Sequence, residues 1–113
     1  GSPGMNFLPC KITNGEINLS GKKIATNSNI KKINFNKIQV GIRPEFVDFS
    51  KDGIPVKVLK VNNVGRHKIV DVESDDGLIK ILSNTQDAIP DGSAFVTFNQ
   101  KYTYAYKDDW IIE

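Results

Sequence analysis

The sequence has few of the side chains that metal binding and nucleophilic catalysis require. Its 113 residues include one cysteine, Cys10, and one histidine, His67. One cysteine cannot form an intramolecular disulfide, and these two residues are too few for a structural zinc site. The single histidine, His67, lies between Arg66 and Lys68 in a turn-like segment, so we expect no catalytic triad around it. Because Cys10 follows Pro9 in an apolar run, we expect it to be a small buried residue.

Several longer signals are also absent. No apolar run approaches the roughly 18 residues needed to cross a bilayer, and no secretory signal pattern is present. Neither a Gly-x-x-x-x-Gly-Lys-Ser/Thr loop nor a Gly-x-Gly-x-x-Gly motif occurs, so no segment is suited to cradle a nucleotide phosphate. The pairs Asp75-Asp76 and Asp108-Asp109 lie in turn-like surroundings, which favours solvated turn residues over acid catalysts. We therefore expect that this chain alone is not an enzyme.

The charge balance is mild. The formal net charge is +2, the isoelectric point is about 8.7, and the lysines are scattered along the chain. Nucleic-acid-binding domains usually have clustered basic residues and an isoelectric point above about 9. The scattered pattern favours a solvated surface, and we expect no nucleic-acid partner.

What the sequence does contain is alternation of apolar and polar residues with period two, which predicts β-strands. Short turn signals separate the segments, such as Asn14-Gly15 and Asp91-Gly92, because these pairs favour the positive φ angles of tight turns. The clearest predicted hairpin runs from residue 68 to 74, turns at Asp75-Asp76-Gly77 and returns over 78–83. Many short strands between turns predict an all-β domain, either a sandwich or a small barrel.

The length fits a single domain over residues 1–113. We interpret residues 1–4 as a linker or a cloning remnant, and residues 5–25 are predicted to form an N-terminal β-ribbon. The polar stretch 26–36 connects this ribbon to the predicted main barrel over residues 37–113. The last apolar residues, from Trp110 to Ile112, fit a final strand or a docking tail.

The block Gly41-Ile42-Arg43-Pro44-Glu45 predicts a corner. Pro44 has no N–H group and cannot continue a central ladder, so we expect a strand to end here and a short helical turn to begin. Arg43 is expected to bond to Glu45 or to a nearby backbone carbonyl. The corner has either a purely structural role or faces a second subunit or another domain.

Three tyrosines alternate near the end of the chain. In an extended strand Tyr102, Tyr104 and Tyr106 would share one face. Such a row could stack nucleobases, as on single-strand-binding barrels, or could form the edge of a core or an interface. Since no basic groove accompanies the row, we favour core or interface.

Several of these motifs, in this order, resemble one family. The start Met5–Pro9, the block Gly41–Glu45, the turn Asn63-Val64-Gly65 and the turn Ile89–Gly92 resemble the C-terminal TOBE domain of ABC importer ATP-binding subunits. The resemblance is to the sugar and glycerol-3-phosphate type, related to the ATPase of the maltose importer. It differs at Arg66-His67-Lys68, where relatives commonly carry an acidic or polar residue.

The resemblance implies a small β-barrel like the oligonucleotide/oligosaccharide-binding (OB) fold, with the added N-terminal ribbon. It implies a non-catalytic regulatory and dimerisation domain. The partners would be its own ATPase domain, a second copy, the permease subunits and regulatory proteins, at the cytoplasmic face of the membrane. ATP and Mg²⁺ would bind to the ATPase domain, not to this chain. The alternatives are a stand-alone OB-fold module that binds single-stranded nucleic acid, and a TOBE domain that binds an oxyanion such as molybdate.

Overall fold

The computed structural model describes residues 4–34 and 36–113, and over these residues the chain is all-β, as the alternation predicts. They form eleven strands and three short 3₁₀ helices, with no α-helix among them. The elements are β1 Asn6–Thr13, β2 Glu16–Leu19, β3 Lys22–Ile24, η1 Ile30–Lys32, β4 Lys37–Ile42, η2 Pro44–Phe46, β5 Val47–Ser50, β6 Ile54–Asn63, β7 His67–Ser74, β8 Gly77–Asn84, β9 Ser93–Phe98, η3 Gln100–Tyr102, β10 Tyr104–Lys107 and β11 Trp110–Ile112.

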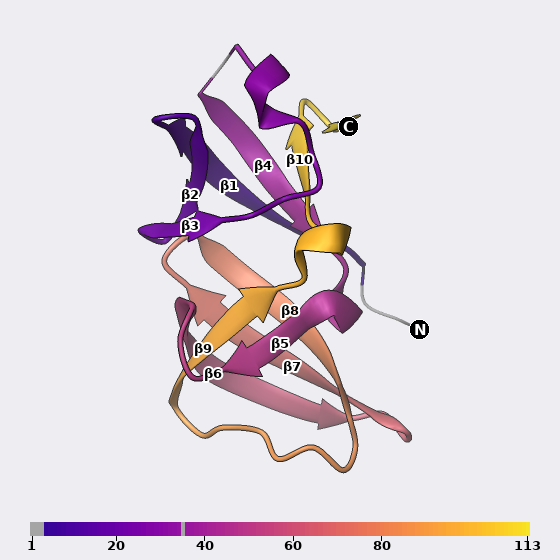
Figure 1. Ribbon diagram of the computed structural model, residues 1–113. Coiled ribbons are helices and arrows are strands. Elements are labelled where there is room, and N and C mark those ends of the chain that lie inside the picture. Colours follow the sequence, from indigo (N-terminus) through magenta and orange to yellow (C-terminus); the bar gives the residue numbers. More distant parts are fainter. Residues whose placement is uncertain (1–3, 35) are drawn as a thin grey trace.

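The strands form two antiparallel sheets, one above the other in Figure 1. Sheet A has the order β11-β10-β4-β1-β2-β3, and sheet B has the order β5-β9-β6-β7-β8. Sheet B is curled, so that its two edge strands β5 and β8 come into contact without pairing. The result is a small two-sheet domain consistent with an OB-like fold.

Two of the predicted turns form tight hairpin loops, whereas Asp91-Gly92 ends the longer loop between β8 and β9. Asn14 and Gly15 both have positive φ angles, 54° and 74°, and join β1 to β2 through a two-residue loop. Such loops match the twist of the flanking strands. The hairpin of β7 and β8 also forms where it is predicted, with Ser74 paired to Gly77 across Asp75-Asp76.

One hydrophobic cluster is shared by the two sheets, and the strand alternation decides which side chains enter it. On β1, Leu8 and Cys10 are buried while Pro9 and Lys11 lie on the outer face of sheet A. The expectation that Cys10 is a buried residue is confirmed. The buried cluster comprises Leu8, Cys10, Ile17, Leu19, Ile38, Val40, Ile42, Val47, Ile54, Val56, Val70, Val72, Ile79, Ile81, Val96 and Ala105.

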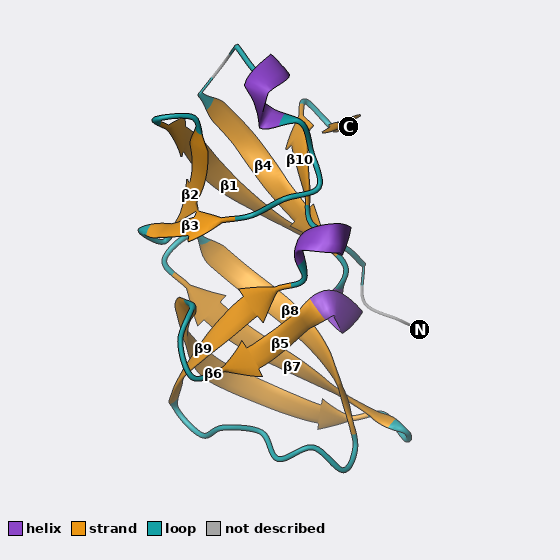
Figure 2. Cartoon of the chain, in the orientation of Figure 1, coloured by secondary structure: helices purple, strands orange, loops and turns teal. Residues whose placement is uncertain are grey.

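The predicted division into a ribbon over residues 5–25 and a barrel over residues 37–113 does not match the sheets. Strand β4 pairs with β1 along its whole length, from Asn6–Ile42 to Lys11–Lys37, and β10 then pairs with β4. The chain therefore leaves sheet A after β4, forms all of sheet B, and returns to finish sheet A. Figure 2 shows η2 and η3, the two crossings, side by side between the sheets.

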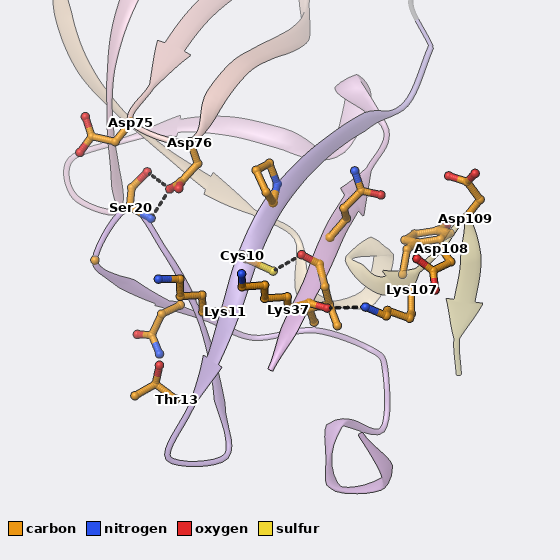
Figure 3. Close-up of a pocket in the computed structure, with 16 residues that line it drawn as sticks. Cys10, Lys11, Thr13, Ser20, Lys37, Asp75, Asp76, Lys107, Asp108 and Asp109 are labelled. Carbon is orange, nitrogen blue, oxygen red and sulfur yellow. Dashed lines mark hydrogen bonds between the residues drawn. The ribbon is translucent and has the colours of Figure 1, made fainter. Parts of the chain in front are cut away.

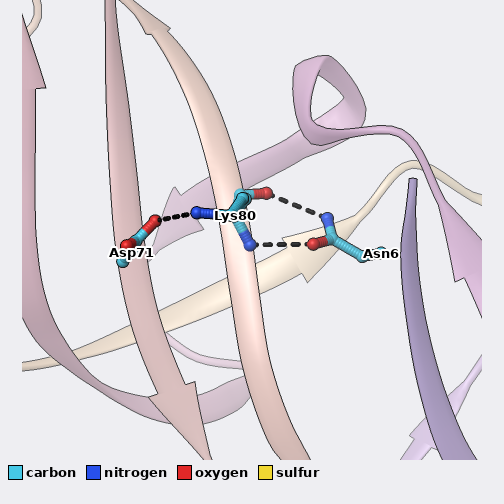
Figure 4. Close-up of polar contacts among 3 residues, drawn as sticks. All are labelled: Asn6, Asp71 and Lys80. Atoms are coloured by element: carbon cyan, nitrogen blue, oxygen red, sulfur yellow. Dashed lines mark hydrogen bonds and ion pairs between the residues drawn. The ribbon is translucent and has the colours of Figure 1, made fainter. Parts of the chain in front are cut away.

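A buried asparagine joins the two sheets where no backbone ladder does. Asn6 Nδ2 donates to the carbonyl of Lys80 at 2.9 Å, and the backbone N–H of Lys80 donates to Asn6 Oδ1 at 2.8 Å (Figure 4). The amide thus imitates one pair of a β-ladder between β1 and β8. The side chain of Lys80 reaches the other way and pairs with Asp71 at 2.8 Å.

Candidate functional site

The first candidate site is the place where the chain crosses between the sheets. We call it the junction, comprising residues 43–46 and 99–102. Pro44 is buried and begins η2, as predicted for a residue that cannot continue the ladder. The backbone of η2 is held at both ends, since Phe46 N–H donates to the Arg43 carbonyl and its own carbonyl accepts from Asn99 N–H, each at 3.0 Å. The corner is therefore rigid.

The two charged residues of the corner point into solvent. Arg43 and Glu45 are both exposed, and neither side chain makes a hydrogen bond or ion pair with any residue that the structure describes. The predicted bond from Arg43 to Glu45 or to a carbonyl is therefore wrong. Buried Pro44 stands between them in the 3₁₀ turn, where residues two positions apart do not face each other.

An aromatic stack closes the junction on its other side. The rings of Phe46 and Tyr102 lie 3.8 Å apart between centroids and are nearly parallel, at 9°. The ammonium of Lys101 lies 5.6 Å from the centre of the Tyr102 ring, within the range of a cation–π interaction. The stack joins η2 to η3, so that an exposed tyrosine and two exposed unpaired charges share one corner of the molecule.

The predicted row of three tyrosines does not form. Tyr102 ends the helix η3, and β10 begins only at Tyr104. Asn99 causes this, because its side-chain oxygen accepts from Lys101 N–H at 3.1 Å and caps a 3₁₀ turn. An asparagine before a polar dipeptide was the available signal for this turn, and the sequence reasoning missed both Asn99 and Phe46.

The remaining predicted residues lie on the outer face of sheet A. Tyr104 Oη accepts from Asn27 Nδ2 at 2.9 Å. The Tyr106 ring packs edge to face on Phe7, with centroids 5.1 Å apart, and covers Gly41. The structure thus brings Arg43, Glu45 and Tyr102 together at the junction, and places the other two tyrosines with Gly41 on the sheet.

A groove crosses the same outer face of sheet A, and we call it the sheet A groove (Figure 3). Its volume is about 880 Å³. Strands β1 and β4 supply the floor, the turns after β2 and β7 supply one wall, and the turn after β10 supplies the other. The lining residues are Pro9, Cys10, Lys11, Thr13, Asn18, Ser20, Gly21, Lys37, Ile38, Gln39, Asp75, Asp76, Tyr106, Lys107, Asp108 and Asp109.

The wall formed by the turns is itself bonded together. Asp76 Oδ2 accepts from Ser20 Oγ at 2.7 Å and also from the Ser20 backbone N–H. This contact ties the β7–β8 hairpin of sheet B to the β2–β3 turn of sheet A. Asp76 therefore has a structural role, and its carboxylate is already engaged.

Little in the site suggests reactive chemistry. Burial, followed by the negative charge of Asp76, raises the pKa of the Cys10 thiol to about 12, so this thiol is not a nucleophile at neutral pH. Over residues 4–34 and 36–113, no three histidine, cysteine, aspartate or glutamate side chains gather as a metal site requires. In the same part of the chain, no helix is long and apolar enough to span a membrane.

Comparison with known proteins identifies similar sequences. Residues 1–47 match the model of the MalK OB fold domain, a stretch that includes both residues 1–4 and the block Gly41–Glu45. The sn-glycerol-3-phosphate import ATP-binding protein UgpC of Vibrio cholerae serotype O1 is 30% identical over 92 residues. That alignment covers 74% of this chain and 24% of UgpC, so the chain spans about a quarter of the length of the curated relative that it matches.

Proposed function

We propose that this chain is a C-terminal accessory domain of an ABC importer ATP-binding subunit, like the MalK OB fold domain whose model its residues 1–47 match, and that it works without catalysis of its own. Its task would be to hold two copies of such a subunit together and to carry regulatory signals to them. The importer would take up a sugar or glycerol 3-phosphate, as the name of the relative suggests. The sequence has no phosphate-binding loop, so ATP and Mg²⁺ would bind to a separate ATPase domain.

The observation that supports this proposal is the junction. Arg43 and Glu45 are exposed, unpaired within the described residues, and carried by a backbone that is fixed at both ends. Because the backbone is already held, only the side chains would lose conformational entropy when these charges pair across an interface. Arginine and tyrosine are also residue types enriched in such interfaces.

A contact between two copies would be self-complementary. In a two-fold symmetric interface the same patch meets itself, so Arg43 of one copy can face Glu45 of its partner, and the reverse pair forms by symmetry. Such a contact raises the effective concentration of two linked ATPase domains for each other. An effector or regulatory protein that binds one arrangement more tightly would shift the cycle by that difference in affinity.

The remaining partners and the location follow from the same proposal. The chain would contact its own ATPase domain and, through the complete subunit, the permease subunits on the cytoplasmic face of the membrane. Reading the coding sequence upstream of residue 1 tests this part. An ATPase domain with a phosphate-binding loop supports it, and an open frame without one contradicts it.

Charge exchange at the junction tests the dimer. We expect sedimentation of the 113-residue chain, at up to about 1 mM because small interfaces are weak, to show self-association. Arg43→Glu and Glu45→Arg should each weaken it by about tenfold or more, and the double variant should restore it. Arg66→Glu, an equal change of charge at an exposed residue of the β6–β7 turn, is the matched control. A monomer at every concentration would contradict the dimerisation role.

A further inference from the structure

We propose that the sheet A groove binds a small phosphate ester that carries free hydroxyl groups. The binding itself is independent of the junction. Its use as a regulatory signal would rest on the proposed function, because only an accessory domain of a larger machine has an activity to modulate.

The size and shape of the groove suit a small metabolite. Its volume of about 880 Å³ lies within the range of roughly 300–1,000 Å³ that small-molecule sites occupy. The floor consists of two central strands of sheet A, and a bonded contact between Ser20 and Asp76 fixes one wall. The groove therefore exists before any ligand arrives.

A pair of lysines in the floor indicates the anionic part of the ligand. Lys11 on β1 and Lys37 on β4 are paired directly across the two strands, on the outer face. Like charges in this position destabilise a sheet. Neither ammonium group has an ion-pair partner among the described residues, although four aspartates line the same groove.

One dianion placed between the two lysines would remove this repulsion. A phosphate group carries two charges at neutral pH and accepts several charge-assisted hydrogen bonds, for which lysine is a common partner. A third lysine reaches the same place, because Lys107 Nζ donates to the carbonyl of Lys37 at 3.3 Å. Figure 3 shows Lys11 and Lys37 between Asp75 and Asp76 on one side and Asp108 and Asp109 on the other.

The rest of the groove indicates hydroxyl groups. Asp108 and Asp109 are acceptors at the far wall, and they would repel a second anionic group but accept bonds from hydroxyls. In the floor, the side chains of half-buried Gln39 and Tyr106 have no hydrogen-bond partner in the described part of the chain. The Tyr106 ring is held in place by Phe7, which gives the ligand a fixed aromatic edge.

Titration of the 113-residue chain with glycerol 3-phosphate tests the proposal. Trp110 is the only tryptophan and is paired with Lys107 across the turn at the far wall, so its fluorescence provides a local readout beside calorimetry. We expect a dissociation constant of about 1 mM or lower, with glycerol alone not binding. Added salt should weaken binding, because the contacts are ionic.

Paired substitutions separate the site from general charge. Lys11→Gln with Lys37→Gln should weaken binding by about tenfold or more, since two charge-assisted contacts are lost. The matched control is Lys31→Gln with Lys32→Gln, which removes the same charge from exposed residues of η1. Thermal unfolding should show that both double variants fold, and the groove variant should be at least as stable as the original.

The titration can contradict the proposed site in two ways. Binding of inorganic phosphate as tight as that of glycerol 3-phosphate would assign the lysine pair to free phosphate and overturn the role of the hydroxyls. No binding of either compound at about 10 mM, or equal losses in the two double variants, would overturn the site. The dimerisation role would survive such a failure, because it is tested at the junction.

Discussion

At Gly41 a glycine is needed because no Cβ atom fits there, and not because the backbone requires a positive φ angle. Its φ angle is not positive, so the extended strand would accept any residue there. A Cβ atom at this position, however, would lie 2.4 Å from Tyr106 Cε1 and 3.0 Å from Phe7 Cε1. The glycine in the corner block therefore lets two aromatic rings pack over the sheet, next to the groove.

Substitution of this glycine should be costly. We expect Gly41→Ala to lower the free energy of unfolding by about 1–3 kcal/mol, because an added methyl group must displace a packed ring. Denaturant unfolding measures this. Gly4→Ala is the matched control, since a Cβ atom there meets nothing within 4 Å, and it should have almost no effect. Equal stability of the two variants would mean that the Tyr106 ring moves freely.

Cys10 should give the chain a distinctive dependence on pH. The pKa of its thiol is about 12 in the folded state, against 9.0 for the ordinary group. Well below pH 9 the thiol is neutral in both states and does not change the stability. Between pH 9 and about 12 the unfolded chain loses the proton first, so stability falls, by at most about 1.4 kcal/mol per pH unit.

Comparison of the original chain with Cys10→Ala isolates this contribution. The difference in their unfolding free energies should shrink as the pH rises above 9, whatever the cost of the substitution at neutral pH. Thiol reagents should also leave the folded chain unmodified at pH 8 and label one thiol per chain in denaturant. Rapid labelling of the folded chain would show that Cys10 is accessible.

At the scale of elements, the hairpin turns could be predicted from their own residues. The 3₁₀ turn capped by Asn99 could not be predicted from strand alternation. Asn-Gly and Asp-Asp-Gly sequences favour the positive φ angles of tight turns, and the two hairpins form where these sequences predict them. The prediction of a row of three tyrosines was wrong, because a period-two pattern does not reveal that Asn99 caps a turn. The bond from Arg43 to Glu45 was wrong because residue types and spacing do not fix the directions of side chains around Pro44.

The Asn6 side-chain amide joins β1 to β8. Its removal should lower the stability of the protein by more than the loss of one side chain usually does. Asn6→Ala would leave the N–H and C=O groups of Lys80 without their partners. We expect a loss of about 2–4 kcal/mol, from two bonds and the desolvation of partly buried groups. Asn63→Ala, at an exposed position in β6, is the control and should change stability little.

Asn6→Asp refines the same test. A carboxylate can still accept from the Lys80 N–H, but it cannot donate to the Lys80 carbonyl. At neutral pH this variant should therefore also be destabilised. If Asn6→Ala and Asn63→Ala proved equally stable, water would be replacing the amide, and the contact would not join the sheets.

At the scale of the whole molecule, the two sheets share one cluster of buried side chains. The chain also passes between them twice, at η2 and η3. We therefore expect both sheets to unfold in a single transition. Near-ultraviolet circular dichroism, which reports on packed aromatic rings such as Tyr106 on Phe7 in sheet A, and far-ultraviolet circular dichroism, which reports on all strands, should give coincident denaturation curves. Two separate transitions would show that the sheets are independent units.

The pairing of distant strands is what the sequence could not reveal. The pattern predicts one strand that ends at the corner before Pro44 and another over residues 102–106. The first is confirmed, and the second is a strand only from Tyr104 on. Nothing in the local sequence indicates that β10 pairs with β4, because paired residues such as Ala105 and Val40 lie 65 positions apart in the chain. For this reason the predicted boundary between ribbon and barrel was displaced, and the sheet A groove, which depends on that pairing, was not foreseen.

The Asn6 contact also bears on aggregation. Strand β8 pairs with β7 on one side only, and its other side is covered by η2, β1 and β5 without a backbone ladder. An edge whose backbone groups become exposed is a template for pairing with another chain. Exposed Leu78 adds apolar surface to this strand, which favours association with another chain. By occupying the Lys80 N–H and C=O groups, the amide blocks the middle of the edge against an incoming strand. Loss of this side chain would thus make the protein prone to form intermolecular sheets even under conditions in which most molecules remain folded.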